Sequence, residues 1–297
     1  NKNNLYLQTA NISEKSLDIA ISTSEHRNPL RSSSYSAYIA NLVSDSFDYD
    51  FSRINITHVN AGVETNNISF LRNYLDLDNA KPIELIKANT IIGPGENSYQ
   101  KNEFKPRVEF PAFFSSLKPI IVSHIGRPDR FYYGGVALQH SSELQFSRRL
   151  ILTSELNYAL FNNFNDGLES RPGSVMEHVR TDLVKYLQES DLYVSRSQLD
   201  YVWSPRKQVF AKISAGIFEM MYGGLGFELL YIPFNRNISI GIESFYVKQR
   251  AYDQRFEFID YETNTSHINF NYKFPMGIEA KLSYGRYLAK DDGYTLD

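Results

Sequence analysis

The side chains that most often carry catalysis or bind metals are few and scattered in this sequence. The chain has no cysteine, and its six histidines are widely separated. Only His178 has a carboxylate four residues later, Asp182, and one such pair is too weak a pattern to predict a metal site. The serine run Ser32–Ser34 lacks the glycines of a nucleophile elbow, so we interpret it as a helix cap. We therefore expect no catalytic residue, no metal and no cofactor.

A larger group of polar residues stands at alternate positions within apolar stretches of the second half of the chain. Side chains two apart on a β-strand point to the same side, so these residues would line one face of a sheet. Two interpretations stay open: the groups neutralise one another in ladders, or they line a hydrated polar path. The candidates are Glu155, Asn157, Arg196, Gln198, Asp200, Lys212, Glu228, Glu243, Asn269, Asn271, Lys273, Glu279 and Lys281.

The elements that must position these residues are strands with a period of two. In His267–Phe274 the odd-numbered positions are polar and the even-numbered positions are isoleucine or aromatic. The same alternation recurs in residues 209–217 and 278–284. We predict roughly eight antiparallel strands between Phe131 and Leu288, of about 9 to 14 residues each, which is long enough to cross a bilayer when tilted.

Four short turns are predicted, each beside an aromatic residue. They are Ser147–Arg149, Ser204–Lys207, Pro233–Asn237 and Pro275–Gly277, next to Phe146, Trp203, Tyr231 and Phe274. In an up-and-down meander alternate connections lie at the same end, so these rings would form one belt at a membrane interface. We expect longer loops at the other end, Asn162–Ser190 and Ala251–Thr265, together with one tight connection at Tyr222–Gly224.

Residues 1–80 predict a small β-α-β-β domain. Leu17–Ile21 alternates like a strand, and Ile54–Val59 and Asn67–Leu75 would pair as a hairpin. Between them, a helix capped by Ser33 would carry a set of apolar side chains: Ile39, Leu42, Val43 and Phe47. Glycine and proline interrupt residues 81–107, which we interpret as a linker, and residues 108–297 as a barrel segment. Phe110–Asp129 would enter that segment as an extended stretch or a plug.

The composition of the chain limits the number of domains and the classes of partner. The 297 residues suffice for one large or two ordinary domains, and a formal net charge of −3 offers no basic field for nucleic acid. No apolar run of about 18 residues occurs, so no membrane-spanning helix is expected. A mean hydropathy of −0.38 also fits a β-barrel with one polar face. Because Tyr294–Asp297 reads like the start of another strand, we expect the protein to continue.

Five short stretches resemble a known family. They are Ser116–Pro119, Gly126–Phe131, Val179–Asp182 with Tyr186, Gly223–Pro233 and Tyr284–Gly293. Together these stretches resemble the YjbH/GfcD-like family of outer-membrane exopolysaccharide and capsule proteins, over roughly Phe110–Asp297. The order and spacing of Tyr284–Gly293 are the most specific part. Members of the family tend to have Gly where Lys290 stands and Arg where Ile232 stands, so single residues are not equated with family residues.

The resemblance implies a longer outer-membrane protein that helps to export a surface polysaccharide without catalysis. On that expectation, the hydrated path along the polar strand residues would exchange hydrogen bonds with sugar hydroxyls, helped by stacking on Tyr and Phe rings. Combined with the strand pattern, it predicts a mainly β protein: a partial antiparallel up-and-down transmembrane β-barrel, preceded by a small α+β domain in the periplasm. The expected partners are outer-membrane lipid, the exopolysaccharide and periplasmic proteins of the same export system, with no nucleic acid. The alternatives are a general outer-membrane porin, a barrel enzyme, or a soluble carbohydrate-binding β-sheet protein.

Overall fold

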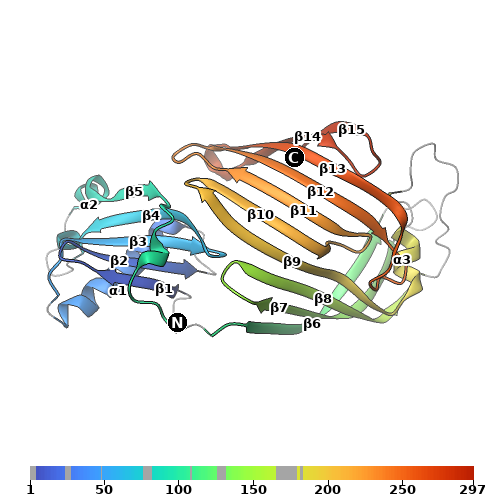
Figure 1. Ribbon diagram of the computed structural model, residues 1–297, viewed down its shortest axis with the longest axis horizontal. Coiled ribbons are helices and arrows are strands. Elements are labelled where there is room, and N and C mark those ends of the chain that lie inside the picture. The colour runs from blue at the N-terminus through green and yellow to red at the C-terminus, as the bar shows by residue number, and fades with distance from the viewer. Residues whose placement is uncertain are drawn as a thin grey trace. The chain divides into compact units, whose positions relative to one another are not determined.

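The protein is mainly β, with two sheets and few helices (Figure 1). The computed structural model describes residues 5–23, 28–47, 49–75, 82–107, 109–125, 132–164, 179–180 and 183–297. One compact unit comprises Asn1–Glu109 with Trp203–Phe210 and Ile232–Arg236, and the other comprises Phe110–Val202, Ala211–Tyr231 and Asn237–Asp297. Within the described residues, no helix is both long and apolar enough to cross a membrane.

The first sheet has five strands in the order β1-β2-β3-β4-β5. Their bounds are Leu5–Ile12, Ser16–Thr23, Arg53–Asn60, Val63–Leu71 and Ile91–Pro94. Helix α1, Pro29–Asp45, connects β2 to β3, which are parallel, and a tight turn with positive φ at Ala61 and Gly62 joins β3 to β4. The expected β-α-β-β order therefore corresponds to β2, α1, β3 and β4, with β1 and β5 added at the edges.

Helix α1 packs on this sheet through small residues, which corrects the predicted cap and apolar face. Asn28 is the N-cap and accepts a hydrogen bond from the Leu30 amide at 2.9 Å, whereas Ser33 is buried within the helix. The residues expected to carry the packing are exposed instead: Ile39, Leu42, Val43 and Phe47. Serines and alanines on the buried face let the helix approach Ile54 and Ile56 of the sheet closely, because a small side chain needs little room.

The segment expected to be a linker contributes regular structure to the first sheet. It contains α2, Ile83–Asn89, the strand β5, and a 3₁₀ turn, η2, at Tyr99–Lys101. Strand β5 pairs with β4, and Phe104 exchanges two backbone hydrogen bonds of 2.9 Å with Ala10. Residues 82–107 are therefore tied to both edges of this sheet.

The second sheet is an antiparallel meander in which each strand pairs with its neighbours in sequence, β6 through β15 (Figure 1). The strands are Ala112–Ile125, Tyr132–Gln145, Leu150–Asn162, Leu192–Arg206, Val209–Ile217, Tyr222–Tyr231, Ile238–Arg250, Phe258–Lys273, Glu279–Arg286 and Asp292–Leu296. Strands β7–β14 are the eight predicted between Phe131 and Leu288. Strand β6 replaces the expected extended stretch or plug, and β15 confirms that the last residues form a strand.

The predicted connections are correct in part. Short turns follow Phe146, Tyr231 and Phe274 as expected, but β9 continues to Arg206, so its turn is Lys207–Gln208. The predicted connection at Tyr222–Gly224 is wrong, because these residues begin β11 and the turn before it is residues 218–221. The loop after β12 is only residues 251–257, since β13 already begins at Phe258. Within the long loop predicted over Asn162–Ser190, residues Leu183–Glu189 form helix α3. Residues 126–131, 165–178 and 181–182 lie outside the described chain.

Candidate functional site

The candidate polar residues lie on one face of the ten-stranded sheet. Strand register places Glu155 opposite Ser141 and Arg196, and Asn157 opposite Gln139. Further along the sheet, Glu228 is opposite Glu243, which is opposite His267. Asn269 faces Ser283, Asn271 faces Lys281, and Lys273 faces Glu279. Directly opposed residues project to the same side, so the pairing joins these side chains into rows across the strands.

In the middle of the sheet these side chains form a hydrogen-bond network. Arg196 donates from Nε and Nη2 to the side-chain oxygen of Gln198, at 3.2 and 2.9 Å. The amide of Gln198 donates to Asp200 at 2.7 Å and to Ser214 at 3.2 Å, and the Ser214 hydroxyl donates to Asp200 at 2.5 Å. On the neighbouring strands Lys212 and Glu228 form an ion pair of 2.7 Å. Charges of both signs are therefore paired in this region.

Polar contacts continue toward β14. The Nδ1 atom of His267 lies 3.2 Å from Oε1 of Glu243, an ion-pair distance rather than an aligned hydrogen bond. The His267 ring also meets the Tyr287 ring edge-on, with the centroids 4.6 Å apart. Asn271 donates to the Ser239 hydroxyl at 3.0 Å. Near the turn, Lys273 and Glu279 pair at 3.0 Å in an exposed position, where such a pair contributes little to stability.

Four further candidates complete this face. Glu155 accepts a hydrogen bond of 3.2 Å from the Ser195 hydroxyl, and Lys281 is half-buried opposite Asn271. Asn157 and Asn269 are 2% and 7% exposed, and within the described chain their side-chain oxygens have no hydrogen-bond partner. A buried amide oxygen left without a partner is costly, and a bridging water molecule at each of these two positions would remove that cost.

The opposite face of the same strands is apolar and open. On β13, Ile268 is 57% exposed while its neighbour Asn269 is 7% exposed, and on β14 Tyr284 is 61% exposed while Ser283 is 7% exposed. This part of β13 and β14 therefore exposes its large apolar side chains and shields the polar ones between them. Among the predicted belt residues, Phe146, Tyr231 and Phe274 are exposed and Trp203 is half-buried. All four stand at the strand ends beside the connections of β7–β8, β9–β10, β11–β12 and β13–β14, which lie at one end of the meander.

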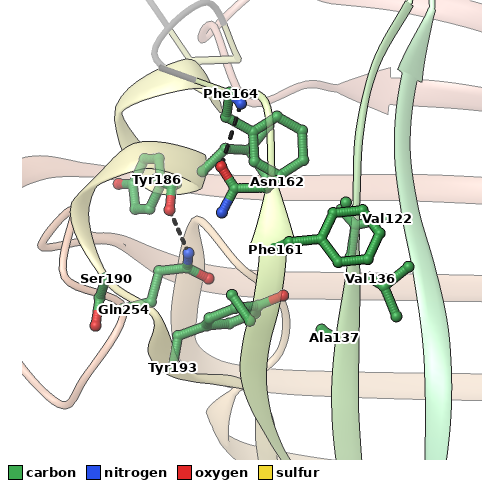
Figure 2. Close-up of a pocket in the computed structure, with 13 residues that line it drawn as sticks. Val122, Val136, Ala137, Phe161, Asn162, Phe164, Tyr186, Ser190, Tyr193 and Gln254 are labelled. Carbon is green, nitrogen blue, oxygen red and sulfur yellow. Dashed lines mark hydrogen bonds between the residues drawn. The ribbon is translucent and has the colours of Figure 1, made fainter. Parts of the chain in front are cut away.

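At the other end of the sheet, helix α3 packs on the polar face, an arrangement that the sequence did not reveal. The hydroxyl of Tyr186 donates to the Arg250 carbonyl at 2.5 Å. The side-chain amide of Gln254 donates to the Tyr186 carbonyl at 2.6 Å (Figure 2). Arg250 is fully buried, and its guanidinium donates to four backbone carbonyls, those of Glu219, Met220, Gln254 and Arg255. The helical spacing of Val179, Leu183 and Leu187 is a sequence signal that could have found this helix.

The cavity beneath α3 is small. Its lining includes Val122, Phe161, Tyr193 and Gln254, and its volume of about 20 Å³ has room for one water molecule (Figure 2). This volume is far below that of a substrate site, so the arrangement joins α3 to the strands rather than forming a catalytic pocket.

A serine and a histidine do meet in the first unit. The Ser33 hydroxyl lies 2.8 Å from Nε2 of His58, and both side chains are buried between α1 and β3. Burial lowers the pKa of His58, an effect that a hydrogen bond with the Pro29 carbonyl opposes in part. Without access to solvent this pair holds the helix against the sheet. Within the described residues, no three metal-ligating side chains come together, and His178 and Asp182 lie outside them.

Comparison with known proteins identifies the family. The family described as "Exopolysaccharide biosynthesis protein YbjH" matches residues 1–297. The "Uncharacterized lipoprotein YjbH" of Escherichia coli (strain K12) is 30% identical over 188 residues, which are 61% of this chain and 27% of that protein. The chain thus spans about a quarter of the length of this relative, and no solved structure matches it. With a match over its whole length, the chain belongs to the YjbH family of exopolysaccharide biosynthesis proteins.

Proposed function

We propose that the large sheet is part of the wall of an outer-membrane β-barrel, with the first unit in the periplasm, and that the protein takes part in exopolysaccharide secretion or surface assembly without catalysing a reaction. The observation that carries this proposal is the arrangement of side chains on β12, β13 and β14. In the part of these strands nearest the short turns, the large apolar side chains are exposed, whereas Asn269 and Ser283 between them are buried; the exposed ones are Ile240, Ile242, Ile268, Phe270, Tyr272, Leu282 and Tyr284.

Water favours exposed polar side chains and buried apolar ones. Lipid favours the arrangement found here, with apolar side chains exposed and polar ones shielded. In a soluble sheet, the apolar face would be covered by a second layer, because a contiguous apolar surface of this extent is unfavourable in water. Against hydrocarbon the same surface has no such penalty, and the strands satisfy their backbone hydrogen bonds with one another. Strands β7, β8, β9, β12 and β13 have 13 to 16 residues, more than the 9–11 or so needed to cross a bilayer at a tilt.

The ends of the meander also support this orientation. Short turns beside Phe146, Tyr231 and Phe274 fit the periplasmic side of such barrels, where aromatic rings lie at the lipid interface. The end that carries the long β8–β9 connection would then be extracellular. Strands β6 and β15 lie at the edges of the sheet, and a sheet edge in lipid would leave backbone groups without partners. We therefore place further strands of a longer protein beside these edges.

The polar face gives this wall a passive role in export. Its paired charges and partnerless amide oxygens suit a hydrated surface along which sugar hydroxyls exchange hydrogen bonds with side chains and water. The polysaccharide itself is inferred from the family description and not from the sheet. Periplasmic proteins of the same export system would meet the protein through its first unit.

Single cysteines test the membrane proposal directly, because the chain has none of its own. Cysteines would be placed one at a time along β13 and β14 of the full-length protein in native outer membranes and labelled with lipid-embedded and aqueous probes. We expect positions 268, 270, 282 and 284 to react from lipid, and positions 269, 271, 281 and 283 to react from water. Uniform labelling from water would overturn the barrel and favour a soluble carbohydrate-binding sheet.

A further inference from the structure

The face of the first sheet that α1 does not cover carries a groove of about 510 Å³. This volume lies within the range of small-molecule sites, about 300–1,000 Å³. Strand register builds the floor: Asn11 is opposite Asp18, which is opposite Asn55, so one row of polar side chains crosses β1, β2 and β3. A second row, one step along the strands, consists of Thr57 and Asn67. Both rows belong to a single unit and were assigned no role from the sequence.

Hydrogen bonds within the floor orient its amides. The side-chain amide of Asn55 donates to Oδ1 of Asp18 at 2.6 Å, and that of Asn67 donates to the Thr57 hydroxyl at 2.8 Å. Each amide has thus used one hydrogen and can offer its carbonyl oxygen and its second hydrogen to a ligand. Neighbouring donors and acceptors of this kind match a sugar, whose adjacent hydroxyls each donate and accept. Ile91, 56% exposed, and Pro94 supply apolar surface for the C–H faces of a sugar ring.

One wall of the groove is held in place by a buried carboxylate. Glu64, 3% exposed, accepts hydrogen bonds from the backbone amides of four consecutive residues: Glu96 and Asn97 to Oε2 at 2.5 and 2.8 Å, and Ser98 and Tyr99 to Oε1 at 2.5 Å each. Beneath this segment, the ring of Tyr99 packs on Ala20 and Val59, and its hydroxyl donates to the Gly62 carbonyl at 3.1 Å. The wall is therefore fixed without a ligand, as a preformed site requires.

The charges of the groove select against an anion. Four consecutive backbone amides would make an anion site, but Glu64 already occupies them. Among the charged residues that line the groove, Lys101 is basic and Asp18 and Glu96 are acidic; Glu96 forms an ion pair of 2.8 Å with Lys207, so Asp18 on the floor is the carboxylate that would repel an acidic sugar. The donor and acceptor groups that remain are mostly uncharged amides and hydroxyls.

We propose that this groove binds a neutral saccharide segment, held by Asn55, Asn67 and Asp18 and packed against Ile91 and Pro94. The site would give the periplasmic part of the protein its own contact with the polymer. The proposal rests on the proposed function for the identity of the polymer, whereas the groove itself is argued from its lining.

The test measures saccharide binding to the full-length protein in detergent by saturation-transfer NMR and calorimetry. The probes are neutral oligosaccharides, namely malto-, cello- and galacto-oligosaccharides together with neutral fragments of the exopolysaccharide of the producing cells, and oligogalacturonate as the acidic probe. We expect at least one neutral probe to bind with a Kd in or below the millimolar range, and oligogalacturonate to bind more weakly. The double variant Asn55→Ala/Asn67→Ala should weaken binding by more than about tenfold.

The matched control is Asn73→Ala, an exposed amide of the same unit that lies outside the groove. It should bind the neutral probe as the unchanged protein does, and circular dichroism melting establishes that the double variant is folded. Binding that survives the double variant, preference for the acidic probe, or no neutral binding at all would each overturn the groove proposal. Cysteine labelling of β13 and β14 is independent of this result, so failure of the groove and failure of the barrel can be told apart.

Discussion

At the scale of single residues, His58 gives the first unit a pH-dependent stability. Its pKa is lowered below the usual value of 6.5 chiefly because the ring is buried against α1. The unfolded chain therefore binds more protons than the folded chain below about pH 6.5, and stability rises with pH in that range. The full contribution is present above about pH 6.5 and is lost progressively as the pH falls toward the lower pKa of the folded state.

Hydrogen exchange checks this expectation. Protection factors of the β3 and β4 amides, corrected for intrinsic exchange rates, should fall between about pH 7 and pH 5 in the full-length protein. The variant His58→Gln should flatten that dependence, whereas His140→Gln in the other sheet should leave it unchanged. A pH dependence that persists in His58→Gln would assign it to another group.

The sequence does not predict the role of residues that depend on the conformation of loops. Arg250 is buried by four backbone carbonyls that come from the turn before β11 and from the loop after β12. No periodic pattern records such an arrangement, and an arginine at the end of a strand is usually exposed. Polar strand residues such as Asn269 and Ser283 were easier to place, because alternation alone fixes the face on which they lie.

At the scale of elements, the segment 96–99 should depend on one carboxylate. In Glu64→Gln a neutral amide replaces the negatively charged carboxylate. Its NH₂ group cannot accept the hydrogen bonds that the backbone N–H groups donate at this position. We expect the free energy of unfolding of the first unit to fall by about 2–4 kcal/mol, since hydrogen bonds to a buried charge are lost. Amides 96–99 should then exchange much faster than those of β3, which does not touch this carboxylate. Equal exchange in the variant and the unchanged protein would show that the wall is held in another way.

The two faces of β13 should respond in opposite ways to a charge. Ile268→Arg puts a cation on the exposed apolar face, and in a bilayer we expect a loss of about 2–4 kcal/mol if the position is near the midplane. Asn271→Arg, on the polar face of the same strand, should cost less than about 1 kcal/mol. Urea unfolding in lipid vesicles, followed by the fluorescence of the single tryptophan, Trp203, measures both. Equal costs at the two positions would contradict an outward lipid-facing surface.

The elements themselves were predictable to different degrees. Strands β7–β14 were recognisable because apolar and polar residues alternate in most of them. Residues Asp260–Thr265 of β13 were missed because their shielded positions are threonines and a tyrosine and their exposed ones are acidic or amide residues, so no apolar alternation marks them. Helix α1 was found, but its packing face was assigned to large apolar residues, whereas serine and alanine make the contact. A helix face that is buried by the close approach of small residues has no pattern of large hydrophobic residues in the sequence.

At the scale of the whole molecule, β15 offers a test of continuation. Backbone hydrogen bonds join Lys281 and Asp297 in both directions, so the amides of Gly293, Thr295 and Asp297 point toward β14. Those of Tyr294 and Leu296 point toward the free edge of the sheet. If further strands complete the barrel, these two amides should be protected from exchange in the full-length protein and should exchange rapidly in a chain that ends at Asp297. Rapid exchange in both would show that β15 is a true edge.

The ten strands pair in the order of the sequence, and this order affects how the sheet assembles and how the number of its strands can change. No strand is inserted between two others that are consecutive in sequence, so each hairpin can form from local contacts and add to the edge of the one before it. For the same reason, gain or loss of one hairpin at an edge leaves the register of every other pair intact. Related proteins can thus differ in the number of strands by duplication or deletion of hairpins, while the alternation that separates the two faces is inherited unchanged.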